Sequence, residues 1–219
     1  MDKYKIGIIG GTGREGKGLG YRWALAGHTI LIGSRSEEKA QAAVAELKEL
    51  LHGEGEVFGM VNEQAVRACD IAVLTVPFAA HKSTLEGLKD ALQGKLLIDV
   101  VVPLVPPKVT RVTMPEEGSA SQQARAVLGP DSKVVAAFQT ISFERLLSGE
   151  LVDSEVFVCG TDKESRELVI GLAEEIGLKA WDAGVIQNAV VVEGLTSILI
   201  GLNIKYNVQS AGIRITGIA

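Results

Sequence analysis

The chain contains one motif with an evident chemical use, a glycine-rich segment close to its start. Gly11, Gly13 and Gly16 form a GxGxxG pattern that directly follows the apolar run 6–9 and opens a helical pattern. A side chain on the first glycine would block a tight turn, one on the second would keep the backbone from a pyrophosphate, and the third allows close helix packing. Because a helix N-terminus offers unpaired N–H groups, the pattern predicts a dinucleotide-phosphate site. The alternative is a tight strand-to-helix turn without a ligand.

The end of the second expected strand indicates which dinucleotide is bound. An acidic residue there would bind the ribose 2′-hydroxyl and repel a 2′-phosphate, but this chain has Ser34 and Arg35. Arg35 follows Gly16 by about 20 residues, the expected spacing, and its planar guanidinium suits a phosphate. Lys39, one helical turn further on, adds a positive charge. We therefore predict NADP rather than NAD, the alternative being that Arg35 is a solvated loop residue.

Side chains that could move a proton are scarce near the expected strand ends. An alcohol or carbonyl substrate usually requires a Tyr–Lys or His–carboxylate pair, yet no tyrosine here precedes a lysine by four positions. Of the histidines, only His81 lies near the carboxyl end of an expected strand, where it could start a helix or belong to a site. Hydride transfer between two redox cofactors depends on positioning more than on acid–base chemistry. We therefore predict no catalytic side chain.

Short β-branched runs alternate with longer helical patterns, which is typical of βαβ units. The expected strands cover 6–9, 28–32, 57–60, 71–76, 96–102, 134–138, 156–159 and 179–181, and the expected helices cover 16–26, 36–51, 80–92, 117–128 and 165–176. Ser36 is expected to cap its helix, and Pro103, Pro106 and Pro107 predict an irregular loop. We predict an α/β, Rossmann-like, mostly parallel doubly wound sheet of about eight strands that ends at Asp182.

The C-terminal part of the chain has a different pattern. Residues 1–182 are predicted to form the NADP-binding domain, and residues 183–219 a small C-terminal helical cap. Segment 189–204 is strongly apolar but contains Glu193, and a membrane span would need about 20 residues and would have to bury that carboxylate. We therefore expect a buried or subunit-interface helix, and with it a homodimer or a higher homo-oligomer.

The composition is that of a folded protein of ordinary size. The 219 residues include 22 basic and 27 acidic ones, giving a net charge of -5, so no positive field would attract nucleic acid or an anionic membrane. Cys69 and Cys159 lie far apart without a neighbouring Cys or His, which argues against a metal cluster and a disulfide framework. We expect a cytoplasmic protein without a metal site.

A wider set of short segments carries a family signature. They are GGTG at 10–13, GKG at 16–18, GSR at 33–35 with Lys39, CDIAVLTVP at 69–77, PLVP at 103–106, VCG at 158–160, DAG at 182–184, and VE and LT at 192–193 and 195–196. Together these segments resemble the NADPH-dependent reductases of coenzyme F-420, the 8-hydroxy-5-deazaflavin hydride carrier. The resemblance spans nearly the whole chain.

This resemblance implies reversible hydride transfer between nicotinamide C4 and deazaflavin C5 in a crevice at the carboxyl ends of the strands. It places the deazaflavin over the 139–143 stretch and against the C-terminal segment 183–219. The residues it implies are Gly11, Thr12, Gly13, Arg14, Glu15 and Gly16 at the pyrophosphate, Ser34, Arg35 and Lys39 at the 2′-phosphate, Val76 and Ala137 beside the nicotinamide, and Gln139, Asn188 and Thr196 at the deazaflavin.

Two departures from the family pattern concern the deazaflavin side. Gln139 and Ser142 stand where some members have His and Pro, and Val190 corresponds to an Arg of some members. How the anionic tail of the deazaflavin is held stays open, with Lys205 and Arg214 as candidates. For Gln139, Asn188 and Thr196 a structural role is as well supported by the sequence as a site role.

Two other functions agree with the same Rossmann pattern, because that pattern does not specify the acceptor. One is an NADPH-dependent reductase of a flavin, a ferric chelate or an imine. The other is a non-catalytic module that senses NADP. The physiological direction of a reversible transfer depends on cofactor potentials and concentrations, so the sequence does not determine it.

Overall fold

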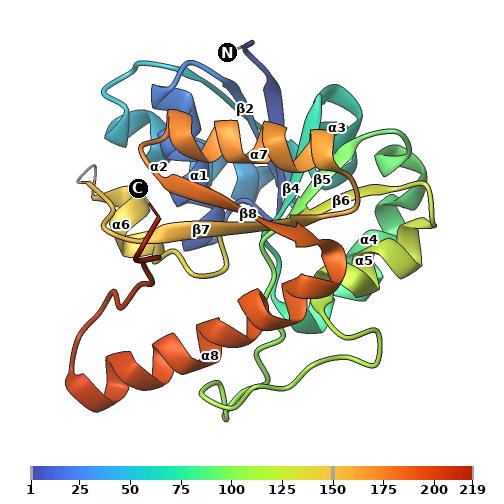
Figure 1. Ribbon diagram of the computed structural model, residues 1–219. Coiled ribbons are helices and arrows are strands. Elements are labelled where there is room, and N and C mark those ends of the chain that lie inside the picture. Colours follow the sequence, from blue (N-terminus) through green and yellow to red (C-terminus); the bar gives the residue numbers. More distant parts are fainter. Residues whose placement is uncertain (1, 149–150, 219) are drawn as a thin grey trace.

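The computed structural model describes residues 2–148 and 151–218 and has an eight-stranded sheet at its centre (Figure 1). The strand order is β3-β2-β1-β4-β5-β6-β7-β8, and every neighbouring pair is parallel except β6 and β7. The strands are β1 (Lys5–Ile9), β2 (Thr29–Ser34), β3 (Glu56–Val61), β4 (Ile71–Leu74), β5 (Leu96–Asp99), β6 (Lys133–Ala136), β7 (Glu155–Gly160) and β8 (Lys179–Val185). The predicted Rossmann-like, mostly parallel sheet is confirmed.

Helices cover both faces of the sheet, because side chains of each strand alternate between the two faces. Ile8 of β1 belongs to one apolar cluster and Ile9 to the other, and both are fully buried. The first cluster is covered by α1 (Arg14–Leu25), α2 (Glu37–Leu50) and α7 (Lys163–Glu175), and the second by α3 (Asn62–Ala68), α4 (Phe78–Leu92) and α5 (Ala120–Leu128). Each such buried side chain stabilises the fold by about 1.5–3 kcal/mol.

Three helices begin at polar caps that the sequence places one residue before them. The Ser36 hydroxyl accepts a hydrogen bond from the N–H of Lys39 at 3.5 Å, which confirms the predicted cap of α2. Ser119 caps α5 in the same way, and Asp162 caps α7. Each cap contributes about 1 kcal/mol because it satisfies an N–H that the helix itself cannot.

Several predicted boundaries are wrong by a few residues, and two short helices were not predicted. The strands β4, β5 and β6 end at Leu74, Asp99 and Ala136, two or three residues earlier than predicted, because the pairing between these strands stops at those residues. β8 continues to Val185 rather than ending at Asp182, since a register shift lets it stay paired with β7. The missed helices are α3 (Asn62–Ala68) and α6 (Phe143–Leu147), which are too short for a clear apolar period.

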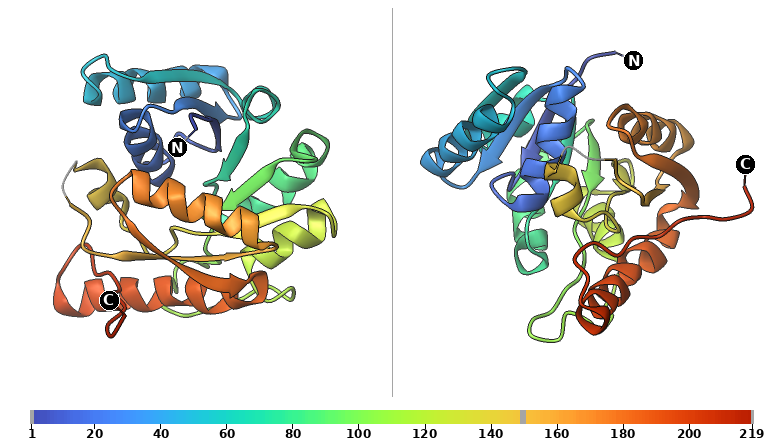
Figure 2. Two further views of the ribbon diagram at one scale, coloured as in Figure 1. Left: turned by 45° about the horizontal axis from the view of Figure 1, so that its top comes forward. Right: turned by 90° about the vertical axis from the view of Figure 1, so that its left-hand side faces the viewer.

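The last helix, α8 (Ala189–Tyr206), follows a short turn, η1 (Ile186–Asn188), and runs along one end of the sheet. The loop between β5 and α5, which holds the three predicted loop prolines, lies alongside it (Figure 2). The two segments are in contact, since a Cβ on Gly194 would lie 3.4 Å from the Met114 side chain and one on Gly201 would lie 3.8 Å from that of Thr110. Within the described residues, 186–206 is the one helical segment long and apolar enough to cross a membrane, and 33% of its most apolar window is buried.

The C-terminal tail turns back from α8 and pairs with the start of β7. The N–H of Glu155 donates to Ile213 O at 2.8 Å, and the N–H of Ile213 donates to the Ser154 hydroxyl at 3.2 Å. The Glu155 carboxylate accepts from the N–H of Ile215 and from the Trp181 indole. Hydrogen bonds at Ile213 and Ile215 therefore hold the tail against β7, although the described residues of the tail form no helix or strand.

Candidate functional site

The glycine loop lies at the switch point of the sheet, between β1 and β4, where chain connections leave in opposite directions. Gly11 donates its N–H to Ile8 O at 3.2 Å and to Gly33 O at 3.0 Å, which joins the ends of β1 and β2. A Cβ on Gly11 would lie 2.9 Å from Ile8 O, and one on Gly16 would lie 2.7 Å from the Gly11 Cα. The tight turn and the close helix packing predicted for these two glycines are therefore present.

Gly13 differs from its neighbours because the fold leaves space beside it. It caps α1, it is exposed, and a Cβ built there would meet nothing nearer than Gly10 O at 3.9 Å. Thr12 is half-buried and Arg14 is exposed next to it. Open space in front of a helix N-terminus is where an anion gains from unpaired N–H groups. The loop therefore has the shape and the polarity that a pyrophosphate requires.

Glu15, the second residue of α1, has an unusual carboxyl group. Its Oε1 atom is buried and has no hydrogen-bond partner. Burial raises the pKa of Glu15 to about 8. The residue as a whole is only half-buried, but burial of the carboxyl group, with Oε1 out of contact with water, disfavours its charged form. The carboxyl is therefore mainly neutral at pH 7, which removes a negative charge from the expected phosphate site.

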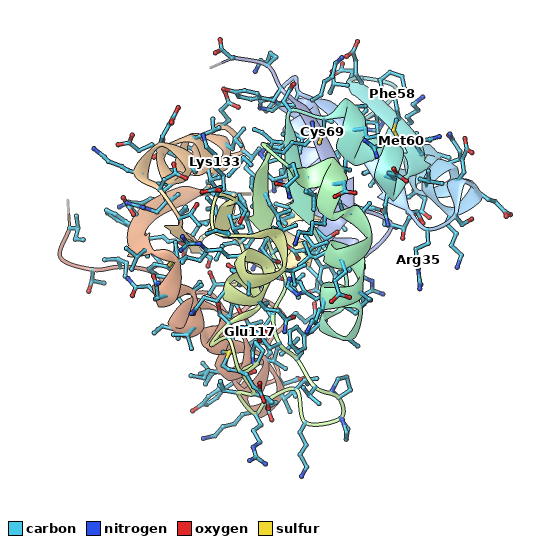
Figure 3. The ribbon with its side chains drawn as sticks, turned by 90° about the vertical axis from the view of Figure 1, so that its right-hand side faces the viewer. Arg35, Phe58, Met60, Cys69, Glu117 and Lys133 are labelled. Carbon is cyan, nitrogen blue, oxygen red and sulfur yellow. The ribbon has the colours of Figure 1, made fainter. Side chains whose placement is uncertain are left out.

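Arg35 projects from the end of β2 into solvent (Figure 3). The Ser34 hydroxyl beside it accepts a hydrogen bond from the N–H of Ser36 at 3.3 Å. Lys39 is exposed one turn into α2, while Glu37 and Glu38 lie in the first turn of that helix. Within the described residues no ion pair joins Arg35 to either glutamate. Two cations thus stand at the end of the second strand, where a 2′-phosphate would be recognised.

Asn62 supports this half of the site, and the sequence analysis missed it. Its Oδ1 accepts a hydrogen bond from the N–H of Gly10 at 3.2 Å. The same oxygen would lie 2.8 Å from a Cβ built on Gly33. Asn62 therefore binds the glycine loop from the start of α3 and lies close against Gly33 at the end of β2. In the sequence, only its position directly after an expected strand could have indicated a role in the site, because the residues around it match no motif.

A second group of predicted residues lies at the ends of β5 and β6. The N–H of Ala137 donates to Asp99 O at 3.4 Å, and the Gln139 side chain donates to the same oxygen at 2.8 Å. The Thr196 hydroxyl of α8 donates to Gln139 O at 2.8 Å. Ala137, Gln139 and Thr196, which are distant in sequence, are thus brought together.

Two contacts connect this group with the glycine loop. The Arg14 guanidinium lies over the ring of Phe143, 5.2 Å from its centroid. Val76, half-buried after β4, approaches the glycine loop so closely that a Cβ on Gly10 would lie 2.6 Å from its Cγ1. Both groups of residues therefore lie at the carboxyl ends of neighbouring strands, the edge at which sheets of this kind bind ligands in a crevice. The Arg14–Phe143 contact joins the glycine loop to the stretch that follows β6.

A buried polar cluster lies behind the ends of β5 and β6. His81 is fully buried as the fourth residue of α4, and its Nε2 lies 2.8 Å from the Asp99 carboxylate. Its Nδ1 lies 3.0 Å from the Gln123 amide oxygen. Burial alone would lower the pKa of His81, but the adjacent carboxylate offsets this, so the pKa lies above its ordinary value. His81 therefore neither starts a helix nor reaches the crevice surface, and it supports Asp99.

Glu193 joins α8 to α5 in the same region. It is fully buried, and its carboxylate accepts from the N–H groups of Ala120 and Ser121 at 2.7 and 3.1 Å and from the Ser121 hydroxyl at 2.9 Å. Burial, aided by the nearby Asp99 charge, raises the pKa of Glu193 to about 7. Glu193, the charged residue within the apolar segment 189–204, thus attaches α8 to the start of α5.

Comparisons with known proteins identify the family of this chain. Residues 5–103 match the family described as NADP oxidoreductase, coenzyme F420-dependent. The F420-dependent NADP reductase of Methanocaldococcus jannaschii is 40% identical over 98% of this chain and 99% of its own, and that of Methanothermobacter marburgensis is 39% identical over 98% and 99%. This chain belongs to the F420-dependent NADP oxidoreductase family.

A solved structure extends this similarity to three dimensions. The crystal structure of a protein from Arthrobacter sp. FB24, described as an F420-dependent NADP-reductase, has a TM-score of 0.82 and 25% sequence identity. The match covers 98% of this chain and 100% of that protein. The family fold therefore includes α8 and the tail as well as the Rossmann-like sheet.

Some positions expected near the deazaflavin of this oxidoreductase family have partners elsewhere. The exposed Asn188 donates its side-chain N–H to Ala183 O at 2.7 Å, within the connection from β8 to α8. Arg214 forms an ion pair with Asp153 at 3.2 Å, and Lys205 lies over the ring of Tyr206. Val190 is partly exposed on α8. These contacts are all at or near the surface.

The surface of this family member has two hollows, and one of them lies near the candidate site. A cavity of about 210 Å³ borders the 139–143 stretch, where Thr140, Ser142 and Arg145 face Ser154 and Ser210. A larger, shallower hollow of about 400 Å³ lies between α5 and η1, away from the glycine loop. The smaller cavity is the more relevant one, because it adjoins residues at the end of β6.

Proposed function

We propose that this protein transfers a hydride reversibly between NADP(H) and the deazaflavin coenzyme F-420. The observation that carries the proposal is the 40% identity with an F420-dependent NADP reductase over 98% of this chain. The positions of the two groups of residues support it, because one group has the features of an NADP site and the other lies at the ends of the nearby strands β5 and β6. We propose no catalytic side chain.

On the NADP side, the residues of the glycine loop bind and orient the nucleotide. The open space at Gly13 receives the pyrophosphate, and the N-terminus of α1 stabilises its charge. Arg35 and Lys39, with Ser34, hold the 2′-phosphate. Arg14 remains placed between the loop and Phe143, where it can keep the two sides of the crevice in register.

On the other side, the residues position a ring rather than move a proton. The nicotinamide supplies or takes up a hydride at its C4 when bound. Val76 and Ala137 limit where that ring can lie, while Gln139, Asn188 and Thr196 border the deazaflavin. Residues buried behind this surface keep water away, which favours direct transfer over side reactions.

We further propose that residues 1–182 form the NADP-binding domain and residues 183–219 complete the acceptor site. The hydrogen bond from Thr196 to Gln139 O supports this division of roles. The exposed apolar side chains of α8 support a homodimer or a higher homo-oligomer, since Val191 and Ile204 are 64% and 69% exposed. The net charge of -5 argues against binding to nucleic acid or to an anionic membrane surface. The two free cysteines, Cys69 and Cys159, favour a reducing, cytoplasmic location.

The decisive test is an absorbance assay with purified protein, NADPH and oxidised coenzyme F-420. We expect rapid loss of the deazaflavin band with NADPH and little loss with NADH at equal concentration. Isothermal titration with NADPH and NADH alone gives the matched binding measurement.

NADPH binding without bleaching would contradict the proposal. Turnover of a flavin, a ferric chelate or an imine would then identify a different reductase. Tight NADPH binding without turnover of any of these acceptors would instead identify an NADP-sensing module.

A further inference from the structure

Gln139 carries a buried hydrogen-bond acceptor that no group in the structure satisfies. The residue is 5% exposed, and its Oε1 has no partner. Burying an amide oxygen without a donor costs about 1–3 kcal/mol. Because nearly all buried polar atoms in folded proteins have a partner, this atom is expected to gain a donor from a bound ligand.

The orientation of this amide is fixed by its other end. Nε2 donates to Asp99 O at 2.8 Å. A reversed amide would place two oxygens against each other, so the carbonyl end must be the unsatisfied one. Asp99 is itself held, because its carboxylate accepts from the N–H of Val101 at 3.1 Å and contacts His81 at 2.8 Å. The unsatisfied oxygen is thus held in place by a rigid, buried support.

The backbone before Gln139 is also strained in a way that aims this side chain. Phe138 has a φ of +74°, a left-handed conformation that costs a bulky residue about 1–3 kcal/mol. Its buried ring packs edge-on against Trp23, with centroids 5.5 Å apart. This packing holds the turn, and the turn directs residues 139–140 from the end of β6 towards α8. A strained backbone conformation of this kind persists only where the surrounding contacts enforce it.

We propose that Gln139 Oε1 accepts a hydrogen bond from an amide or imide N–H of a bound cofactor and thereby selects the orientation of the cofactor's ring. This rests on the function proposed above. Two donors have the required chemistry, the carboxamide N–H of the nicotinamide and the N–H of the deazaflavin's pyrimidinedione ring. Because Oε1 is covered in the structure, the ring reaches it only after neighbouring side chains move aside.

The first experiment compares NADP⁺ with its acetylpyridine analogue, in which a methyl ketone replaces the carboxamide and removes its N–H. Affinities are measured by isothermal titration with the full-length wild type and with Gln139→Met, which keeps the size but lacks the amide. If the nicotinamide is the donor, the wild type prefers NADP⁺ by about tenfold, which corresponds to one hydrogen bond. Gln139→Met should bind the two nucleotides equally.

The second experiment tests the deazaflavin through binding alone, by the change of its fluorescence on titration with protein. If its ring N–H is the donor, Gln139→Met weakens deazaflavin binding by about tenfold while the nucleotide preference stays unchanged. Neither arm requires turnover, so failure of the proposed reaction would be seen separately in the absorbance assay.

The matched control is Gln41→Met on α2, whose amide also donates to a main-chain oxygen, Gly59 O, at 2.9 Å but is exposed. It should change neither affinity. Thermal unfolding of both variants checks that each is folded, and Gln139→Leu, which also lacks the amide, replaces Gln139→Met in both titrations if Gln139→Met is unstable. Unchanged nucleotide preference together with unchanged deazaflavin affinity in a folded Gln139→Met would overturn the proposal.

Discussion

The two sides of the crevice are built in opposite ways. On the NADP side, Gly11, Gly13 and Gly16 come from one stretch of seven positions that begins at Gly10, and the chain itself brings them together. On the acceptor side, Asp99, Gln139 and Thr196 come from three separate elements and meet through hydrogen bonds. The first side therefore depends on backbone shape and the second on long-range packing. Substitutions should separate the two kinds of dependence.

The largest effect should come from Glu193→Ala, which tests whether the acceptor side depends on packing. The N–H groups of Ala120 and Ser121 would lose their acceptor inside the fold, so we expect a loss of about 3 kcal/mol in the free energy of unfolding. Denaturant unfolding measures it. Glu63→Ala, which removes only an exposed ion pair with Arg67, is the control and should cost less than about 1 kcal/mol. Equal losses in the two variants would show that α8 is attached by other contacts.

The same residue gives the acceptor side a pH dependence. Burial raises the pKa of Glu193 from 4.5 to about 7, so this carboxyl's contribution to stability is complete below pH 4.5 and is lost as the pH rises to about 7. The loss amounts to about 3 kcal/mol. In Glu193→Gln, which mimics the protonated form, the free energy of unfolding should depend less on pH between pH 5 and 7. If the free energy of unfolding changes with pH as steeply in Glu193→Gln as in the wild type, other groups cause the pH dependence.

Arg35→Ala should affect only the NADP side. Losing the guanidinium removes a charge-assisted contact of about 1.5–3 kcal/mol, so NADPH should bind about 10- to 100-fold more weakly while NADH binding is unchanged. Titration calorimetry gives both constants, and Arg67→Ala is a control because that arginine pairs with Glu63 in its own helix. A parallel fall in NADH affinity would mean that Arg35 does not read the 2′-phosphate.

Two glycine variants should distinguish a glycine that the fold needs from one that nucleotide binding needs. Gly16→Ala places a methyl group 2.7 Å from backbone, so it should lower stability by about 1–3 kcal/mol. Gly13→Ala meets no atom nearer than 3.9 Å, so it should fold normally yet bind NADPH several-fold more weakly. Thermal unfolding and nucleotide titration of each variant distinguish the two effects. Normal NADPH binding by Gly13→Ala would contradict a pyrophosphate at that place.

The smallest effect should come from Glu15. Burial raises the pKa of its carboxyl to about 8, and a neutral carboxyl tolerates a nearby phosphate better than a carboxylate does. NADPH affinity should therefore fall a few-fold as the pH rises through about 8, and Glu15→Gln should remove that fall. Titrations between pH 7 and 9 measure it. The same fall in both proteins would exclude Glu15 as its origin.

The features that could be predicted from the sequence are those with a local cause. The Ser36 cap, the turn at Gly11 and the alternation of strands and helices each depend on a few neighbouring residues. The boundaries at Leu74 and Val185 were misjudged because pairing partners, rather than propensity, decide where a strand ends. Site assignments for individual residues remain predictions for the variants above.

The order of the residues alone therefore accounts for a Rossmann-like fold, for a phosphate loop and for the cations expected to favour NADP, since each arises within one βα unit. Folding added what no local pattern contains. It paired His81 with Asp99, placed Glu193 against α5 and left the Gln139 oxygen buried without a donor. The physical reason is that hydrogen bonds between distant elements depend on how the elements pack, and packing is a property of the whole chain.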